Sequence, residues 1–264
     1  PLVAGVADAL AGAGIACFGP SQAAAQLEGS KSFTRAFADS CGIPSPVSQT
    51  FTSAGDAIAW FDEQPFDVVV KADGLAAGKG VIIPESRDET VAAITSMIDG
   101  GALGAAGSTI VLEERMTGEE LSLFGISDGS TVIALATAQD HKRVGEGDTG
   151  PNTGGMGAYT PAPCLTDALE AQVRQDIIEP SLRAMADAGT PFQGILFAGI
   201  MLTHSGPKLL EYNVRFGDPE CQVLMMRLGA QVLDLMQAAV ENRLDKAQVN
   251  WADDHALTVV LAAT

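Results

Sequence analysis

The chain has 264 residues, of which 47% are hydrophobic, and its formal net charge is −18. This length and composition predict a globular protein of one large or two modest domains, and they exclude a disordered chain. So acidic a chain is not expected to bind nucleic acid, because the phosphates would repel it.

The cysteine and hydropathy patterns indicate the cellular setting. None of the four cysteines has the spacing of a metal site. No apolar run approaches the roughly 18 residues that a membrane span requires. We therefore expect a cytoplasmic protein with reduced thiols and no membrane association.

Hydrophobic periodicity and turn residues predict an alternation of helices and strands. In chain order, we expect a helix over 3–13, a strand over 15–18, helices over 30–41 and 54–63, strands over 67–72 and 81–83, a helix over 88–98, strands over 109–112, 121–126 and 131–138, a helix over 166–187 bent before Pro180, strands over 194–202 and 208–214, helices over 220–228 and 232–240, and an unpaired strand over 256–263.

Lys31 stands in an unfavourable place for a cation. Ser30 or Ser32 can cap the helix that ends at Cys41, so Lys31 falls in its first turn, against the helix dipole. A bound anion would explain this position. The alternative is a solvated surface lysine, which the spacing fits equally well.

A glycine-rich segment over 71–81 joins two strands and holds Gly74, Gly78, Lys79 and Gly80. Glycines allow backbone N–H groups to close around phosphate oxygens, and the lysine adds positive charge. The segment is not a Walker A loop, because Gly80 follows Lys79 where Ser or Thr should stand. An ordinary glycine hairpin is the alternative interpretation.

Two further stretches are candidates for binding. Residues 113–122 are rich in charge, which fits either a nucleotide-binding segment or a solvated β-turn. Residues 139–159 are expected to form a long loop without regular structure, and such a loop is usually functional or disordered. Its basic residues, asparagine and glycines favour a substrate loop. His141 could act as a base, but a single histidine without a paired acid is more often structural.

The strand that starts at 208 carries the strongest signal. Alternation places Glu211, Asn213 and Arg215 on one face and Leu210 on the other. Residues two apart on a strand lie about 6.6 Å apart. Two oxygens side by side suit Mg²⁺, which takes its remaining ligands from water and phosphate. The guanidinium offers a planar fork for a carboxylate or phosphate.

A turn and a helix start follow this strand. Gly217, Asp218 and Pro219 form the turn, and Pro219 can open the next helix, which leaves Asp218 and Glu220 near its N-terminus. The alternative for the whole stretch is an amphipathic edge strand whose polar face is only wet.

The run over 211–222, Glu-Tyr-Asn-Val-Arg-Phe-Gly-Asp-Pro-Glu-Cys-Gln, resembles the diagnostic motif of the phosphoribosylamine–glycine ligase family, which has the ATP-grasp fold. The resemblance extends along nearly the whole chain. It implies an α+β protein: an ATP-grasp fold of two α+β subdomains, preceded by the tail of a Rossmann-like α/β domain.

The resemblance also assigns roles to residues, by position in this sequence. ATP as cofactor would meet Lys31, Lys71, Gly74, Gly78, Lys79 and Gly80 at its phosphates, and Glu113, Glu114, Met116 and Glu120 at its base and ribose. Glu211 and Asn213 would hold Mg²⁺ or Mn²⁺. The substrates would meet Asp140, His141, Lys142, Asn152, Gly154, Gly155, Met156, Arg215, Asp218 and Glu220, and the catalytic residues would be Arg215, Lys79 and Asp218.

The implied activity joins glycine to 5-phosphoribosylamine through a glycyl phosphate and gives glycinamide ribonucleotide, ADP and phosphate in purine biosynthesis. The implied domains are the end of a Rossmann-like domain over 1–26, an ATP-grasp domain over 27–250 with a lid over 72–137, and the start of a C-terminal domain over 251–264. We expect a monomer truncated at both ends. The alternatives are another ATP-grasp carboxylate–amine ligase and a Mg·ATP-binding fragment without turnover.

Overall fold

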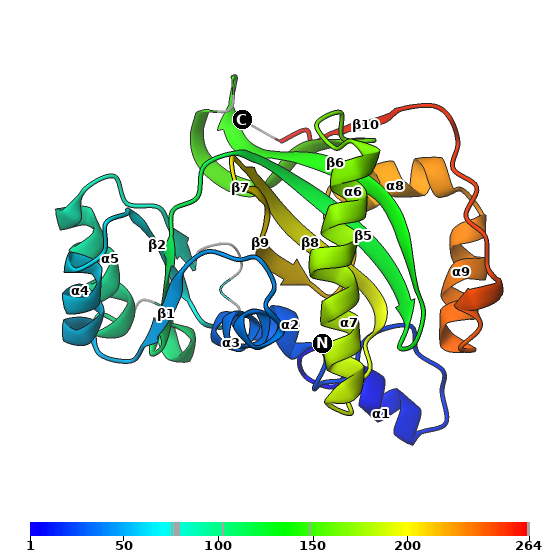
Figure 1. Cartoon of the computed structure of the whole chain (residues 1–264), viewed down its shortest axis with the longest axis horizontal. Coiled ribbons are helices and arrows are strands. Elements are labelled where there is room, and N and C mark those ends of the chain that lie inside the picture. Colours follow the sequence, from blue (N-terminus) through cyan, green and yellow to red (C-terminus); the bar gives the residue numbers. More distant parts are fainter. Residues whose placement is uncertain (75, 77–79, 102, 148, 263–264) are drawn as a thin grey trace.

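The computed structural model of the chain describes residues 1–74, 76, 80–101, 103–147 and 149–262. Its strands form two antiparallel sheets, one of four strands in the order β1-β4-β2-β3 and one of six in the order β10-β7-β6-β5-β8-β9 (Figure 1). Helices and antiparallel sheets together make an α+β protein, as the sequence predicts.

The helices and strands lie close to the expected ranges. The helices are α1 (Val6–Gly12), α2 (Gln26–Gly29), α3 (Lys31–Cys41), α4 (Ala54–Asp62), α5 (Arg87–Ile98), α6 (Asp167–Val173), α7 (Glu179–Asp187), α8 (Glu220–Leu228) and α9 (Gln231–Val240). The strands are β1 (Ser48–Phe51), β2 (Val68–Ala72), β3 (Val81–Ile82), β4 (Ile110–Glu114), β5 (Glu119–Asp128), β6 (Val132–Gly145), β7 (Thr149–Thr160), β8 (Gln193–Thr203), β9 (Gly206–Asn213) and β10 (Ala256–Val259).

The four-stranded sheet has its own small core. Val70 and Leu112 from the sheet pack against Ile94 and Met97 of α5, and all four are buried. Helices α4 and α5 lie together over this sheet, at the left of Figure 1. Strand β2 is buried almost along its whole length, and its first three residues are β-branched valines, which suit a buried strand.

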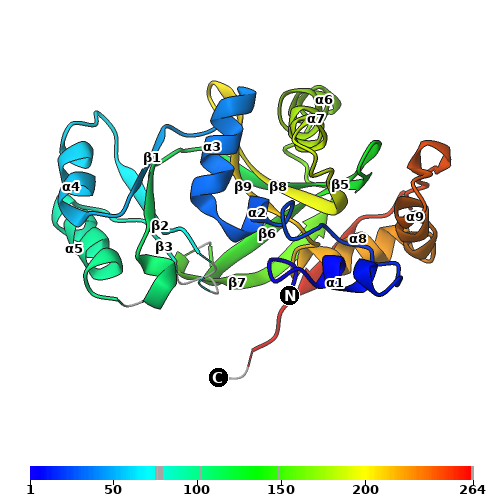
Figure 2. The same cartoon turned by 90° about the horizontal axis from the view of Figure 1, so that it is seen from below.

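The six-stranded sheet is covered on both faces. Leu121 and Leu123 of β5 belong to a core shared with α7, whereas Phe124 and Ile126 belong to a second core shared with α8 and α9. Successive side chains on a strand point to opposite faces, so one strand can supply both cores. Figure 2 shows α6 and α7 on one side of this sheet and α8 on the other.

Strand β9 contains a bulge that the sequence pattern did not indicate. Glu211 pairs with Gly199, but the next residue of β8 pairs with Leu209, so Leu210 is an extra residue. Leu209 therefore occupies the core beside Tyr212, where the alternation had placed Leu210. The bulge resets the alternation, and Glu211 remains on the face that points away from this core.

Four expectations need correction or refinement. Residues 139–159 are not a structureless loop but the facing arms of the β6–β7 hairpin, which has two register shifts. Residues 15–18 form no strand, because no other strand pairs with them. The last strand is not alone, because β10 pairs with β7. The bend expected before Pro180 is a π-helical turn over Arg174–Ile178 between α6 and α7.

Within the described residues, no single helix is both long and apolar enough to cross a membrane. Helices α8 and α9 satisfy the length and composition criteria only as a pair, and they meet at a bend of 101°.

Candidate functional site

One face of β5 changes from apolar to polar along its length. Phe124 lies in the core under α8 and α9, but Ser122 and Glu120, on the same face, lie beyond that core. The neighbouring strands continue the change with Asp140 and Lys142 on β6. Polar and charged side chains thus collect on the part of the sheet beside the start of α8.

Lys142 is the positive centre of this polar region. Its ammonium pairs with the Glu120 carboxylate and lies 3.5 Å from an Asp140 oxygen. Burial alone would lower the pKa of Lys142, but Glu120 and Asp140, with Glu211 further away, hold that pKa above its ordinary value. The lysine is therefore charged at neutral pH, and its charge is offset by the surrounding carboxylates.

Glu220 lies at the buried edge of the same region. It is 3% exposed and accepts a hydrogen bond of 3.3 Å from the Ser122 hydroxyl. Burial, and then the charge of Asp140, raise the pKa of Glu220, while Lys142 acts in the opposite direction. A carboxyl held in this way can carry a proton more readily than a surface glutamate can.

The small sheet contributes a buried ion-pair network. The Glu113 carboxylate on β4 lies 2.8 Å from the Lys71 ammonium of β2 and 2.8 Å from Nε of Arg35 on α3. Burial opposes ionisation of Glu113, but Lys71 and Arg35 more than offset it and lower its pKa. The lysine expected to bind phosphate is thus held by a carboxylate.

Lys31 lies in the first turn of α3, as expected, and Ser30 caps that helix by accepting from the Phe33 N–H. The Lys31 Nζ lies 3.5 Å from the carbonyl oxygen of Gly74, which follows β2. Burial, together with the charge of Lys71, lowers the pKa of Lys31, while Glu211 acts to raise it. At a half-buried lysine beside another lysine, a bound anion would relieve repulsion.

Glu211 and Asn213 share a face of β9, as the sequence predicts. The Glu211 side chain is exposed, whereas Asn213 is 9% exposed and its Oδ1 accepts a bond of 3.0 Å from Arg215 Nη2. Arg215 is also held by Glu28, whose carboxylate lies 3.2 Å from its Nε. The guanidinium therefore lies against Asn213, one of the two expected metal ligands.

These residues belong to one assembly, which we call the charged cluster. Its members are Lys31, Lys71, Glu113, Glu120, Asp140, Lys142, Glu211 and Glu220. Glu211 connects its two halves, because its charge acts on Lys31, next to the small sheet, and on Lys142, on the large sheet. Residues far apart in the sequence thus lie within electrostatic range of one another.

The turn after β9 packs against the second arm of the β6–β7 hairpin. A Cβ at Gly155 would stand 2.4 Å from Cδ of Pro219 and 3.2 Å from the carbonyl oxygen of Asp218. Only glycine allows so close an approach. The Asp218 carboxylate accepts a bond of 2.8 Å from Gln222. The structure therefore brings together two of the stretches expected to bind substrate.

In the segment expected to bind the base, the first backbone N–H groups already make hydrogen bonds within the protein. The Glu114 and Arg115 N–H groups donate to the carbonyl oxygens of Val47 and Asp67, each at 2.8 Å. The Glu114 carboxylate lies 3.6 Å from the Lys208 ammonium. Hydrogen-bond donors for a base would therefore have to come from Met116 onward, beyond the paired strand β4.

The remaining expected residues are less fully placed. Gly78 and Lys79 lie outside the described residues, and Asn152 is described only through its backbone pairing with Arg143. The His141 ring lies 5.6 Å from the Tyr159 ring, in a tilted arrangement typical of packing. The Gly80 carbonyl oxygen accepts a hydrogen bond from the Ala72 N–H, and Gly154 and Met156 lie on β7.

Several residues at the site gave no signal in the sequence. Arg35, Glu28, Asp73 and Ser122 all contact expected site residues or their neighbours. Asp73 accepts from the Ser32 N–H at 2.7 Å and so ties the start of α3 to the end of β2. Their partners are distant in sequence, and only the folded chain reveals them.

The donor set can be tested against a divalent cation. Among the described residues, no group of three or more His, Cys, Asp and Glu side chains is arranged to hold a metal ion. The Glu211 carboxylate and the Asn213 amide oxygen remain, and Mg²⁺ commonly uses only one or two protein carboxylates together with substrate phosphates. The residues present therefore fit a magnesium ion that arrives with a phosphate ligand, and not a closed protein site.

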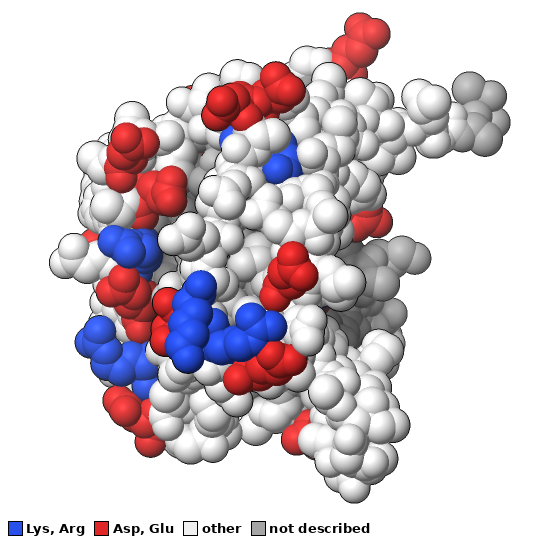
Figure 3. All heavy atoms as spheres, turned by 90° about the vertical axis from the view of Figure 1, so that its right-hand side faces the viewer, with Lys and Arg blue, Asp and Glu red and all other residues white. Residues whose placement is uncertain are grey.

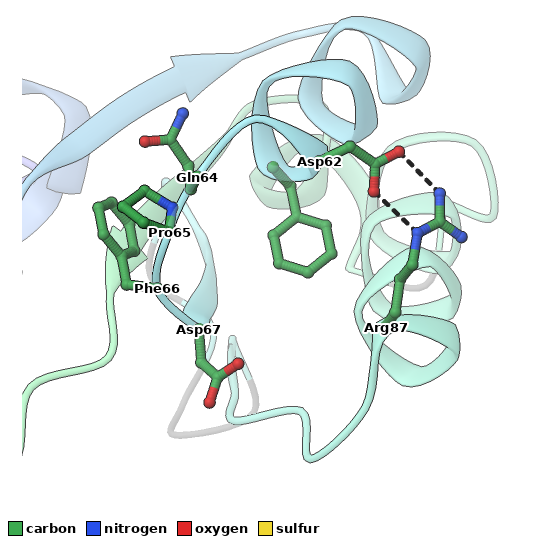
Figure 4. Close-up of a pocket in the computed structure, with 7 residues that line it drawn as sticks. Asp62, Gln64, Pro65, Phe66, Asp67 and Arg87 are labelled. Carbon is green, nitrogen blue, oxygen red and sulfur yellow. Dashed lines mark hydrogen bonds and ion pairs between the residues drawn. The ribbon is translucent and has the colours of Figure 1, made fainter.

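Two cavities lie away from the charged cluster. One, of about 470 Å³, lies between the end of α4 and the start of α5, where Arg87 and Asp62 form an exposed ion pair at 2.7 Å (Figure 4). The other, of about 590 Å³, lies beside α1 and the β5–β6 turn. Figure 3 shows acidic and basic side chains interspersed on the face that it displays, with no patch of one sign.

The chain resembles known proteins over its whole length. The family model described as phosphoribosylglycinamide synthetase, ATP-grasp (A) domain, matches residues 29–221. Proteins named phosphoribosylamine–glycine ligase from Brucella melitensis and Agrobacterium fabrum are each 56% identical to it over 263 residues. The chain is covered completely in both comparisons but spans only 61% and 62% of those relatives.

A solved structure shows the same arrangement. The crystal structure of phosphoribosylamine–glycine ligase from Thermotoga maritima superposes with a TM-score of 0.87 at 31% identity. The match covers 93% of this chain and 62% of that one. The fold, with its two facing sheets, is therefore the ATP-grasp fold.

Proposed function

The chain belongs to the phosphoribosylglycinamide synthetase family, and on that premise we propose that it carries the ATP-dependent step that joins glycine to 5-phosphoribosylamine. The products are glycinamide ribonucleotide, ADP and phosphate, a step of purine biosynthesis. The single observation that supports the proposal most is the charged cluster, in which the ion pairs of Lys71 and Glu120 lie within electrostatic range of Glu211 although these residues are far apart in the sequence.

The chemistry proceeds in two transfers. A glycine carboxylate oxygen attacks the γ-phosphorus of ATP, which releases ADP and forms glycyl phosphate. The amine of 5-phosphoribosylamine then attacks the glycyl carbonyl carbon, loses a proton and expels phosphate. Phosphoryl transfer needs little covalent help from protein, so catalysis depends on positioning and on neutralising charge.

The residues of this chain divide that work. Lys31 and Lys71 neutralise the phosphates, and Lys79 of the glycine-rich segment is assigned the same role. A magnesium ion, when bound with the nucleotide, would be held by Glu211 and Asn213 and would supply positive charge to the phosphate oxygens. Arg215 orients the acyl phosphate, since its guanidinium lies beside Asn213.

The substrate side is assigned to the hairpin and the turn that it meets. Asp140, Lys142, Gly155 and Asp218 lie in or against this region, and Glu220 with its raised pKa is suited to hold a proton near the amine. We further propose that the domain limits are those expected from the sequence, with a lid over 72–137, and that the protein acts in the cytoplasm as a monomer.

The proposal is tested by nucleotide binding and by turnover. Mg·ATP should bind this chain in calorimetry, and Glu211→Gln should weaken that binding at least tenfold. Glu63→Gln, on an exposed residue that follows α4, is the matched control and should bind as wild type does. Equal affinity in wild type and Glu211→Gln would remove the metal role.

Release of ADP decides the substrates. It should require both glycine and 5-phosphoribosylamine, and release with a different carboxylate would assign another ATP-grasp ligase. Binding of Mg·ATP without any release would favour a nucleotide-binding fragment. That second candidate rests on a specific observation, because the chain spans only 61% of the length of its Brucella relative.

A further inference from the structure

Arg35 has four hydrogen bonds from one buried guanidinium. The residue is 4% exposed and lies in the second turn of α3, a helix whose first residue is Lys31. Its Nε and Nη2 donate to the two oxygens of Glu113 at 2.8 and 3.0 Å. Its Nη1 donates to the Leu209 carbonyl oxygen at 3.1 Å, and Nη2 also donates to that of Leu210.

These partners belong to different sheets. Glu113 is on β4 of the four-stranded sheet, whereas Leu209 and Leu210 are on β9 of the six-stranded sheet. One planar group therefore touches both halves of the molecule. Because a guanidinium presents its donors in a rigid fork, it fixes the directions of its partners as well as their separation.

The bulge in β9 makes this arrangement possible. Leu210 is the extra residue of the bulge, so its carbonyl group leaves the regular pairing pattern with β8 and is free to accept from Arg35. Glu211 follows it directly, and Asn213 is two residues further on. The anchored point of β9 is thus the point next to the two expected metal ligands.

On the side of the small sheet, the Arg35 guanidinium reaches Lys71 indirectly, through the Glu113 carboxylate. The Glu113 carboxylate is shared, since Oε2 also lies 2.8 Å from the Lys71 ammonium. Lys71 is 7% exposed and extends from β2, which pairs with β4. A carboxylate clamped from one side by Arg35 holds the ammonium on its other side in one place.

We propose that Arg35 is a positioning residue that sets the Lys71 ammonium of the small sheet relative to Glu211 and Asn213 of the large sheet. The proposal rests on the proposed function, in which these groups hold the two ends of one Mg·triphosphate. Arg35 itself touches no substrate. It acts through Glu113 toward Lys71 and through the β9 carbonyl groups toward the metal ligands.

A purely structural role has to be separated from this one. Buried ion pairs are weak evidence of a stabilising function, and the loss of one partner destabilises a protein wherever the pair lies. A positioning role makes a further demand, because the effect of Arg35 on nucleotide binding must disappear once Lys71 can no longer contribute.

The first test is therefore a cycle of variants. Arg35→Lys keeps the positive charge but loses the fork, and Lys71→Met removes the ammonium. Thermal melting and circular dichroism confirm that each variant is folded. Calorimetry with Mg·ATP should show roughly a tenfold loss for Arg35→Lys, the lower range for residues that orient ligands. In the Lys71→Met background, the same change should cost less than about twofold. An equal loss in both backgrounds, or no loss in either, overturns the proposal.

A second test does not depend on nucleotide binding. Dyes introduced through unnatural amino acids at exposed Glu63 and Asp187 report the distance between the small-sheet and large-sheet halves. Single-molecule energy transfer should show a broader or displaced distribution in Arg35→Lys than in wild type. An unchanged distribution refutes the anchoring. If wild type fails to bind Mg·ATP, the proposed function falls, and this measurement still decides whether Arg35 anchors the sheets.

Discussion

Changing Glu113 to glutamine should destabilise the protein by about 3–5 kcal/mol, the range for breaking a buried ion pair by altering one partner. The carboxylate accepts from Arg35 Nε, Arg35 Nη2 and Lys71 Nζ at 2.8, 3.0 and 2.8 Å. A glutamine of the same shape replaces one oxygen with an NH₂ group, which turns a donor toward a cation. Two buried cations would then share one neutral acceptor.

Urea unfolding is the suitable assay, with fluorescence as the signal. The chain has two tryptophans, and Trp60 packs against the core of the small sheet while Trp251 packs against a core of the large one. Glu63→Gln is the control and should lie within about 0.5 kcal/mol of wild type, as surface changes do. A Glu113→Gln variant less than about 1 kcal/mol weaker than wild type would refute the reasoning.

The same pair of proteins should respond differently to acid. The folded pKa of Glu113 lies below its ordinary value of 4.5. Its contribution is therefore present above that value and is lost as pH falls through the folded pKa. The gap in unfolding free energy between wild type and Glu113→Gln should be constant near neutrality and should narrow only below about pH 4.5. A gap that stays constant through the acid range would contradict the ion-pair account.

Two other outcomes follow from the substrate side. Gly155→Ala should destabilise the protein by about 1–3 kcal/mol, the cost of overpacking, because the new Cβ would stand 2.4 Å from Pro219. The same change should slow ADP release. Gly154→Ala is the control in the same thermal melts, because nothing lies within 4 Å of a Cβ at that position. The pKa of Glu220 is raised in the folded protein, so the free energy of unfolding of wild type falls as pH rises and Glu220 ionises. The free energy of unfolding of Glu220→Gln should therefore increase relative to that of wild type as pH rises from below 4.5 to neutrality. A relative stability that does not change with pH would show that the carboxyl ionises freely.

Elements defined by local residues were predictable from the sequence. Helix α8 runs over Glu220–Leu228 as expected, because Pro219 precedes its start and Gly229 follows its end. The cap of α3 by Ser30 is confirmed for the same reason. Both signals involve residues within four positions of one another, and backbone preference alone decides them.

The features that the sequence did not predict depend on pairing between residues far apart in the chain. Residues 139–159 contain many glycines and polar residues, so their own preferences favour a loop, and only pairing between the two arms makes them strands. Arg35 and Glu113 are 78 positions apart, and nothing near either residue indicates the other. The joint presence of the charged residues was predictable from their resemblance to a family, but the contacts that hold them were not.

The extra residue of the β9 bulge, Leu210, adds a contact to Arg35 without adding a paired position to the strand. If Leu210 were deleted, Leu209 and Glu211 would become neighbours opposite Ile200 and Gly199, and the ladder would run without interruption. Both faces of the strand would keep their side chains, yet the guanidinium beneath would lose one of its carbonyl partners. The extra residue that interrupts regular pairing therefore supplies the carbonyl group by which Arg35 holds β9. A strand with regular pairing throughout would lack this contact.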